Sequence, residues 1–300
     1  MSVPTLHLSP AERRSGCLSE EHAAAAVRIL DELGCVALRG AVDPTHVDIV
    51  CERMLEDIAT YEAGGGTLGH NWQGLRPPPC HPYLFTDMYF NDFAVAVAQA
   101  MGIGHPDDGG LQGGGANSNV SYAVGPGHPP TMQEVHTDSA PPFDPDASDA
   151  DYERPGSVYV NVPLCDAGAE TGATEMWLVR WIATFRRSCR LANPKEGRHC
   201  QGTHRDPGLR RGHGYGDPTL RRSTSWPTPT MLTAWEAEHG PPVRALAKRG
   251  DILLRDSRVW HRGRCAPRPC SRVARAAFPP TARPMQSVRA GRTLGRRTAR

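Results

Sequence analysis

The spacing of apolar and polar residues predicts a helix, a strand and a second helix near the start of the chain. A serine N-cap followed by two acidic residues begins a predicted helix over residues 19–33, and Gly34 ends it. The apolar run at residues 35–39 predicts a short strand. A second helix is expected over residues 44–61, because a proline begins it and the glycines at 64–66 end it.

Beyond residue 66 a loop-like stretch precedes a short apolar helix, which is expected over residues 93–101. Short apolar runs between turns then predict strands at residues 119–124, 157–163, 174–177, 243–247, 251–254 and 273–278. Short strands that follow helices favour a mainly β fold with flanking helices. We therefore expect a jelly roll that is buttressed by N-terminal helices.

Length and charge narrow the class of protein. A chain of 300 residues can bury one sizeable core, so we expect a single catalytic domain over residues 19–280, after an N-terminal extension over residues 1–18. The 34 basic and 32 acidic residues nearly cancel, which argues against recruitment of nucleic acid or acidic membrane by a global field. No apolar run has the length of a membrane span or follows a signal-peptide pattern. The nine cysteines form no CxxC pair, and we expect a cytoplasmic protein without disulfides.

Two polar segments stand apart from this pattern. Residues 195–225 are dense in Gly, Arg and His, which is typical of a solvated insertion. Residues 281–300 predict a basic, disordered tail, and no acidic residue follows Asp256. The tail leaves open a second class of function, the binding of RNA or acidic lipid through phosphate contacts. It has no aromatic residues for base stacking, so such binding should be weak and sensitive to salt.

The motif His-x-Asp occurs four times, and its surroundings decide which copy is suited to hold a metal. Three copies lie in a predicted helix, a turn-rich loop and the polar insertion: His46/Asp48, His105/Asp107 and His204/Asp206. His136 and Asp138 differ because the predicted strand at 119–124 leads toward them. Since residues i and i+2 of a strand project from the same face, this copy can direct both side chains at one ion.

A third candidate ligand, His261, lies far along the chain, after the predicted strand at 251–254. Two imidazoles and one carboxylate on one face of an octahedron hold Fe(II) and leave the opposite face open to a co-substrate and O2. The alternative is that both histidines are ordinary buried residues that donate to backbone carbonyls. The set of His136, Asp138 and His261 favours a non-haem iron oxygenase.

Four segments, in this order, resemble the phytanoyl-CoA dioxygenase family of Fe(II)/2-oxoglutarate oxygenases. They are residues 34–40, 133–138, 170–177 and 249–263. The resemblance implies a double-stranded β-helix with His136, Asp138 and His261 as the iron ligands. It also implies that 2-oxoglutarate and O2 are consumed, that succinate and CO2 are released, and that a small organic substrate is hydroxylated or otherwise oxidised.

The same resemblance places three residues at the co-substrate. Arg272, eleven residues after His261, would pair with the distal carboxylate, for which the planar guanidinium fork is well suited. Gln133 would contact 2-oxoglutarate through its amide, and Thr174 is a further pocket candidate. Related halogenases carry a small residue where this chain has Asp138, so oxidation is favoured over halogenation.

The chain departs from the family pattern in two places. Residues 178–181 stand where a Pro-Gly turn ending in His is usual, and residues 264–270 stand where a Pro-Asn turn is usual. These changes leave open a catalytically impaired, cupin-like protein that still binds metal. The motifs do not identify the substrate, and both a monomer and a homodimer are compatible with them.

Aromatic residues before the first motif admit two interpretations. They either line a substrate pocket, as such residues often do in the family, or cover one end of the core. These residues are Trp72, Tyr83, Phe85, Tyr89 and Phe90.

Overall fold

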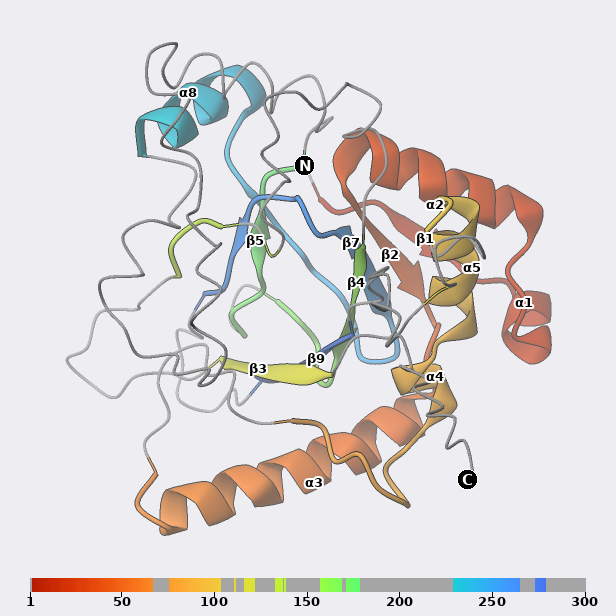
Figure 1. The fold of residues 1–300 in the computed structure, drawn as a ribbon, viewed down its shortest axis with the longest axis vertical. Coiled ribbons are helices and arrows are strands. Elements are labelled where there is room, and N and C mark those ends of the chain that lie inside the picture. Colours follow the sequence, from red (N-terminus) through yellow and green to blue (C-terminus); the bar gives the residue numbers. More distant parts are fainter. Residues whose placement is uncertain are drawn as a thin grey trace, which may run out of the picture.

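A computed structural model shows two β-sheets with helices around them (Figure 1). It describes residues 2–66, 76–103, 111, 116–121, 133–136, 138, 157–168, 171–178, 229–264 and 273–278. The strands are β1 (Thr5–His7), β2 (Cys35–Arg39), β3 (Asn117–Ser121), β4 (Val158–Pro163), β5 (Glu175–Met176), β6 (Val243–Arg244), β7 (Ile252–Asp256), β8 (His261–Arg262) and β9 (Val273–Phe278). The helices are α1 (Pro10–Ser15), α2 (Glu20–Leu33), α3 (Pro44–Ala63), α4 (Thr86–Tyr89), α5 (Asp92–Ala100) and α8 (Pro229–His239).

The larger sheet has six strands in the order β1-β2-β7-β4-β9-β3, and the smaller has three in the order β6-β5-β8. Strand β1 pairs with β2 in parallel, and the other neighbours pair antiparallel. Consecutive strands of the chain are seldom neighbours in these sheets. Long-range pairing therefore places the N-terminal strand β2 beside β7, which comes much later in the chain.

Successive side chains of a strand point to opposite faces of the sheet, and the larger sheet is apolar on both faces. Val36 and Leu254 belong to the core formed with helices α2, α3 and α5. Ala37 and Leu253 belong to a second cluster, which they share with Met176 of the smaller sheet. The larger sheet thus separates a helix-side core from an interior between the two sheets.

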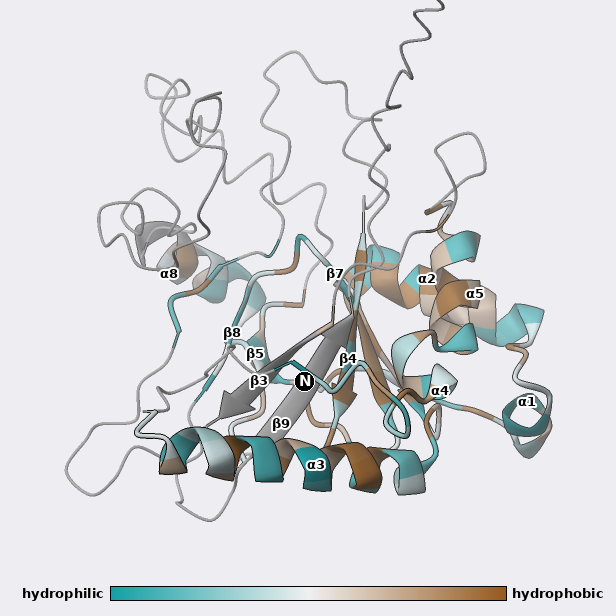
Figure 2. Cartoon of the chain, turned by 60° about the horizontal axis from the view of Figure 1, so that its bottom comes forward, coloured by the Kyte–Doolittle hydropathy of each residue, from teal (hydrophilic) through white to brown (hydrophobic). Residues whose placement is uncertain are grey.

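The helices differ in how much apolar surface they carry. Figure 2 shows α5 as hydrophobic over most of its length, whereas α3 alternates between hydrophilic and hydrophobic residues. Helix α2 begins at the N-cap Ser19 and ends at Gly34, whose φ of 75° is a left-handed C-cap. These ends agree with the prediction.

Most predicted elements are found, with shifts at their ends. The strand at 35–39 and the strand at 273–278 have the predicted bounds. The strand predicted at 119–124 begins earlier, at Asn117, and the one predicted at 243–247 ends sooner, at Arg244. Elements β1, α1, α4, α8 and β8 were not predicted. Strand β1 has only three residues, and its pairing with β2 keeps it extended.

The predictions of a polar insertion, a basic tail and no membrane span concern segments of which the structure describes only a part. The predicted insertion at 195–225 and the tail at 281–300 lie outside the described residues. Over the part of the chain that the structure describes, no helix is both long and apolar enough to cross a membrane.

The aromatic residues before the first motif differ in whether they pack against the core. Tyr83, Phe85 and Tyr89 pack against the helix-side core, which confirms the core-covering interpretation for these three. Phe90 is 64% exposed, and Trp72 lies outside the described residues.

A buried carboxylate joins α1 to α2. Glu12 accepts hydrogen bonds from the backbone amides of Ser9, at 2.8 Å, and Ser19, at 2.9 Å, and its Oε1 lies 2.9 Å from Nδ1 of His22. Burial by itself would raise the pKa of Glu12, but the amides of Ser19 and Ser9 outweigh burial and lower it from 4.5 to about 2. The ionised side chain therefore caps the starts of both helices.

We predict that Glu12→Gln lowers the free energy of unfolding by about 2 kcal/mol at pH 7, because the amides lose a charged acceptor. The folded-state pKa lies below the ordinary value, so this contribution is complete above about pH 5 and declines as the pH falls toward 2. Urea unfolding at pH 7, 5 and 3.5 should show the difference between wild type and variant shrinking as the pH falls. A difference that stays constant with pH would contradict this.

Gly34 lies where α2, β2 and the turn before His261 meet. A Cβ atom at this position would overlap Cγ2 of Val259, and the left-handed backbone also disfavours any side chain. The carbonyl of Gly34 accepts the amide of Asp256 at 2.9 Å. The close approach of Val259 to Gly34 and the hydrogen bond from Asp256 both hold the turn that leads into β8.

We predict that Gly34→Ala destabilises the protein by about 2 kcal/mol or more, because Val259 must shift in addition to the backbone strain. Gly65→Ala is the matched control: Gly65 also has a positive φ, of 84°, but a Cβ atom there meets nothing within 4 Å. The control should lose only about 1 kcal/mol in thermal or urea unfolding. Equal losses in the two variants would refute the role of the Val259 contact.

Candidate metal centre

Backbone pairing places His136 beside His261. The two residues exchange both of their amide-to-carbonyl hydrogen bonds, each at 3.0 Å. On its other side, His261 pairs with Met176 of β5. Strand β8 therefore lies between β5 and the segment that carries His136.

The segment around His136 is held along its whole length. The amide of Gln133 donates to the carbonyl of Gly263 at 3.0 Å, and the amide of Asp138 donates to the carbonyl of Ser257 at 3.1 Å. Residues 133–138 thus run antiparallel to residues 257–263. This pairing sets the positions of His136 and Asp138 relative to His261.

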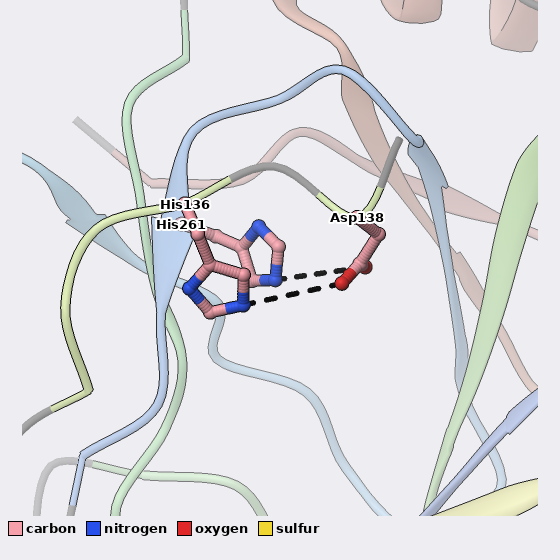
Figure 3. Close-up of side chains that lie close together, drawn as sticks. All are labelled: His136, Asp138 and His261. Carbon is pink, nitrogen blue, oxygen red and sulfur yellow. Dashed lines mark ion pairs between the residues drawn. The ribbon is translucent and has the colours of Figure 1, made fainter. Parts of the chain in front are cut away.

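The three side chains converge (Figure 3). Nε2 of His136 lies 3.9 Å from Oδ1 of Asp138, and Nε2 of His261 lies 3.6 Å from Oδ2. Among the described residues, these three are the group of possible metal ligands, with ligand atoms within 4.8 Å of one another. A cation between them would meet two nitrogens and one oxygen.

The other nitrogen of each imidazole contacts a backbone carbonyl. Nδ1 of His136 lies 2.7 Å from the carbonyl oxygen of Glu134, and Nδ1 of His261 lies 3.0 Å from that of Val259. Because a carbonyl only accepts, Nδ1 of His136 must carry the proton, and for His261 the contact with the Val259 carbonyl at 3.0 Å is shorter than that with Nη1 of Arg255 at 3.3 Å and favours the same tautomer. Each Nε2 is then left with a lone pair, and both point toward Asp138. Donation to carbonyls, the alternative raised above, is therefore compatible with metal binding.

Burial and electrostatics keep His261 and Asp138 in the protonation states that a metal needs. Burial, followed by the nearby Arg255, lowers the pKa of His261 to about 3, so its imidazole is neutral. Burial would raise the pKa of Asp138, but Arg255 and then His261 lower it to about 2. A neutral imidazole and an ionised carboxylate are the ligand forms of these groups.

Arg255 is the residue of the centre that sequence analysis missed. Its side chain, on β7, is 4% exposed; Nη2 pairs with Oδ2 of Asp138, and Nη1 lies 3.3 Å from Nδ1 of His261. The guanidinium also lies over the ring of Tyr159, 4.9 Å from its centroid. An arginine next to the buried run Ile-Leu-Leu was the available signal, because such a charge needs a buried partner.

The residues expected at the co-substrate are only partly described. The side-chain oxygen of Gln133 accepts the amide of Gly263 at 2.9 Å, and the carbonyl of Thr174 accepts the amide of Ala245 at 2.8 Å. Arg272 lies outside the described residues. The contacts of all three with a co-substrate stay predictions.

The remaining His-x-Asp copies do not compete with this centre where they are described. Nδ1 of His46 lies 2.9 Å from the carboxylate of Asp87, whereas Asp48 pairs with Arg249. His46 and Asp48 both lie on helix α3, and each side chain has its own partner elsewhere in the chain. This agrees with the prediction that the motif lies on a helix surface. The copies at 105–107 and 204–206 lie outside the described residues.

Tryptophans pack behind the histidines. Val135, Trp177, Trp235 and Trp260 form a separate apolar cluster, and the rings of Trp235 and Trp260 have centroids 4.7 Å apart. Trp177 donates through Nε1 to Glu236 of α8 at 3.1 Å. Helix α8 is therefore attached to the strand that carries His261.

Comparisons with known proteins identify the fold. No protein-family model and no curated protein sequence matches the chain significantly. The solved structure of the epimerase SnoN in complex with Fe3+, alpha ketoglutarate and nogalamycin RO matches with a TM-score of 0.51 and 11% identity, covering 88% of this chain and 85% of SnoN. At this identity the likeness is one of fold.

Two further structures match less closely. AviO1 from Streptomyces viridochromogenes Tue57 has a TM-score of 0.49 and 13% identity, over 88% of this chain and 96% of AviO1. The non-heme alpha ketoglutarate dependent carbocyclase SnoK from nogalamycin biosynthesis has a TM-score of 0.48 and 16% identity, over 88% and 84%. Membership of the phytanoyl-CoA dioxygenase family stays a prediction.

Proposed function

We propose that this chain is an Fe(II)- and 2-oxoglutarate-dependent oxygenase that acts on a small organic molecule. One observation carries the proposal: two Nε2 lone pairs and an ionised carboxylate face one another within 4.8 Å. Two imidazoles and one carboxylate with open positions are the donor set of non-haem Fe(II) oxygenases. His136, Asp138 and His261 would hold the iron.

The donor set also argues against a structural zinc site and against Ca²⁺ or Mg²⁺. Structural zinc sites are usually closed by four ligands, often with cysteine, whereas Ca²⁺ and Mg²⁺ prefer oxygen ligands. The described cluster contains two nitrogens, one oxygen and no thiolate. Bound iron, together with 2-oxoglutarate and O2, would supply an oxidation that releases succinate and CO2.

The fold supports the same assignment. SnoN, which shares the fold, was crystallised with Fe3+ and alpha ketoglutarate. We propose that the two sheets form a double-stranded β-helix, that residues 19–280 make up one oxygenase domain, and that the cytoplasm is its location. The fold alone does not specify the reaction, so the assignment depends on the side chains of the centre.

The chain's own residues would then position the reactants and exclude water. Arg272 is proposed to pair with the distal carboxylate of 2-oxoglutarate, with Thr174 nearby. The side-chain oxygen of Gln133 is already used by Gly263, so only its NH2 group is suited to an acidic co-substrate. Asp138 occupies the position that halogenases leave to chloride, and we therefore propose hydroxylation or a related oxidation.

An anaerobic titration tests the proposal. We predict that wild-type protein binds Fe(II) and that added 2-oxoglutarate then produces a weak visible charge-transfer band. His136→Ala and Asp138→Ala should each abolish the band and weaken Fe(II) binding by at least about 100-fold, since each removes one of three ligands. His7→Gln, which changes an exposed histidine on β1, is the matched control and should keep the band.

The outcomes separate the candidate functions. Absence of Fe(II) binding by wild type, or a band that persists in both ligand variants, would refute the proposal. Fe(II) binding without the band, and without succinate release, would favour the impaired cupin-like protein. Binding of RNA or acidic lipid that is lost on removal of residues 281–300, with turnover intact, would show that the tail acts separately.

A further inference from the structure

Arg255 is a buried charge with a small set of described partners. Its side chain is 4% exposed, and a buried guanidinium is strongly destabilising unless it is paired. The partners that the structure shows for it are the carboxylate of Asp138 and the ring of Tyr159, and its Nη1 also lies 3.3 Å from Nδ1 of a third residue, His261. Two of the three belong to the candidate metal centre.

The backbone directs Arg255 to this place. On β7, Ile252 and Leu254 face the helix-side core, and Leu253 faces the interior between the sheets. Arg255 follows the same alternation as Leu253 and therefore points into that interior. It is paired with Tyr159 on one neighbouring strand and with Cys35 on the other. Its position therefore depends on a central strand, which is more rigid than a loop.

The ion pair with Arg255 gives the two carboxylate oxygens of Asp138 different contacts. Nη2 of Arg255 holds Oδ2, which also lies 3.6 Å from Nε2 of His261, whereas Oδ1 faces Nε2 of His136 at 3.9 Å. A carboxylate that is held at one oxygen presents the other in a defined direction. Arg255 thereby orients Asp138 for binding a metal through a single oxygen.

The same ion pair changes the charge balance of the centre. The charges of Arg255 and Asp138 cancel, so a divalent cation that binds alone leaves two positive charges uncompensated at a partly buried centre. A dicarboxylate that binds beside the cation brings negative charge that offsets them. The guanidinium therefore opposes the cation alone and favours the cation together with a dianion.

We propose that Arg255 is a positioning and charge-balancing residue that couples the binding of a divalent metal to the binding of an anionic co-substrate. This inference rests on the proposed function and deepens it. By linkage, the metal strengthens binding of the dianion by the same factor as the dianion strengthens binding of the metal. The metal and the dianion thus bind cooperatively, and the metal binds weakly when the co-substrate is absent.

The test measures the affinity for Mn(II), by electron paramagnetic resonance, with and without saturating 2-oxoglutarate. The ratio of the two affinities is the coupling factor. Loss of orientation of Asp138 weakens Mn(II) in both conditions and cancels in this ratio, whereas the charge of Arg255 does not cancel. Direct chelation of the metal by 2-oxoglutarate contributes equally in every variant.

We predict that Arg255→Gln reduces the coupling factor by roughly tenfold, because one unit charge near the dianion is removed. Arg255→Lys, which keeps the charge but loses the planar fork, should retain the coupling within about threefold while binding Mn(II) more weakly. Arg28→Gln, on the exposed side of α2, is the matched control and should change neither quantity. If Arg255→Gln does not fold by circular dichroism, Arg255→Met supplies an uncharged side chain of similar length.

Failure of this inference is distinguishable from failure of the proposed function. If wild type binds Mn(II) with coupling and the uncharged variant has an equal coupling factor, Arg255 has no such role and the oxygenase proposal stands. If wild type binds no Mn(II), or if 2-oxoglutarate has no effect on Mn(II) in any variant, the proposed function is overturned and this inference with it.

Discussion

The pair of backbone hydrogen bonds between His136 and His261 is the contact on which the rest of the centre depends. Each bond is 3.0 Å long, and together they place two imidazoles side by side with ring centroids 4.4 Å apart. The same antiparallel run places Asp138 opposite the turn at Ser257. The positions of the three candidate ligands are thus set by backbone geometry, which leaves the side chains few ways to diverge.

The strands near the centre carry the candidate ligands on one face and apolar packing residues on the other. His136 and His261 point inward, and the residues that precede them, Val135 and Trp260, join the tryptophan cluster beneath α8. Because successive residues of a strand alternate between faces, a change in the register of β8 would move both sets at once. The packing of α8 therefore supports the inward direction of the imidazoles, although α8 supplies none of the three candidate ligands.

Charge inside the protein is organised around Asp138. Its carboxylate is stabilised by Arg255 strongly enough to outweigh the effect of burial, and the same guanidinium disfavours a proton on His261. The carboxylate is kept ionised by one cation on the central strand β7, and the imidazole of His261 is kept neutral first by its burial and then by the same cation. The arrangement prepares the ligands for a metal and makes Asp138 dependent on Arg255.

The sequence by itself determined the local elements and the choice of candidate ligands. Ser19 and Gly34 cap a helix through interactions within a few residues, and the apolar run at 35–39 forms a strand, as predicted. Among the four His-x-Asp copies, sequence context selected His136 and Asp138, and the structure brings both of them to His261. Only the tertiary structure decided the role of Arg255 and the existence of β1, α8 and β8. These depend on pairing and packing between distant segments, and no local pattern of residues encodes a partner that lies more than a hundred positions away.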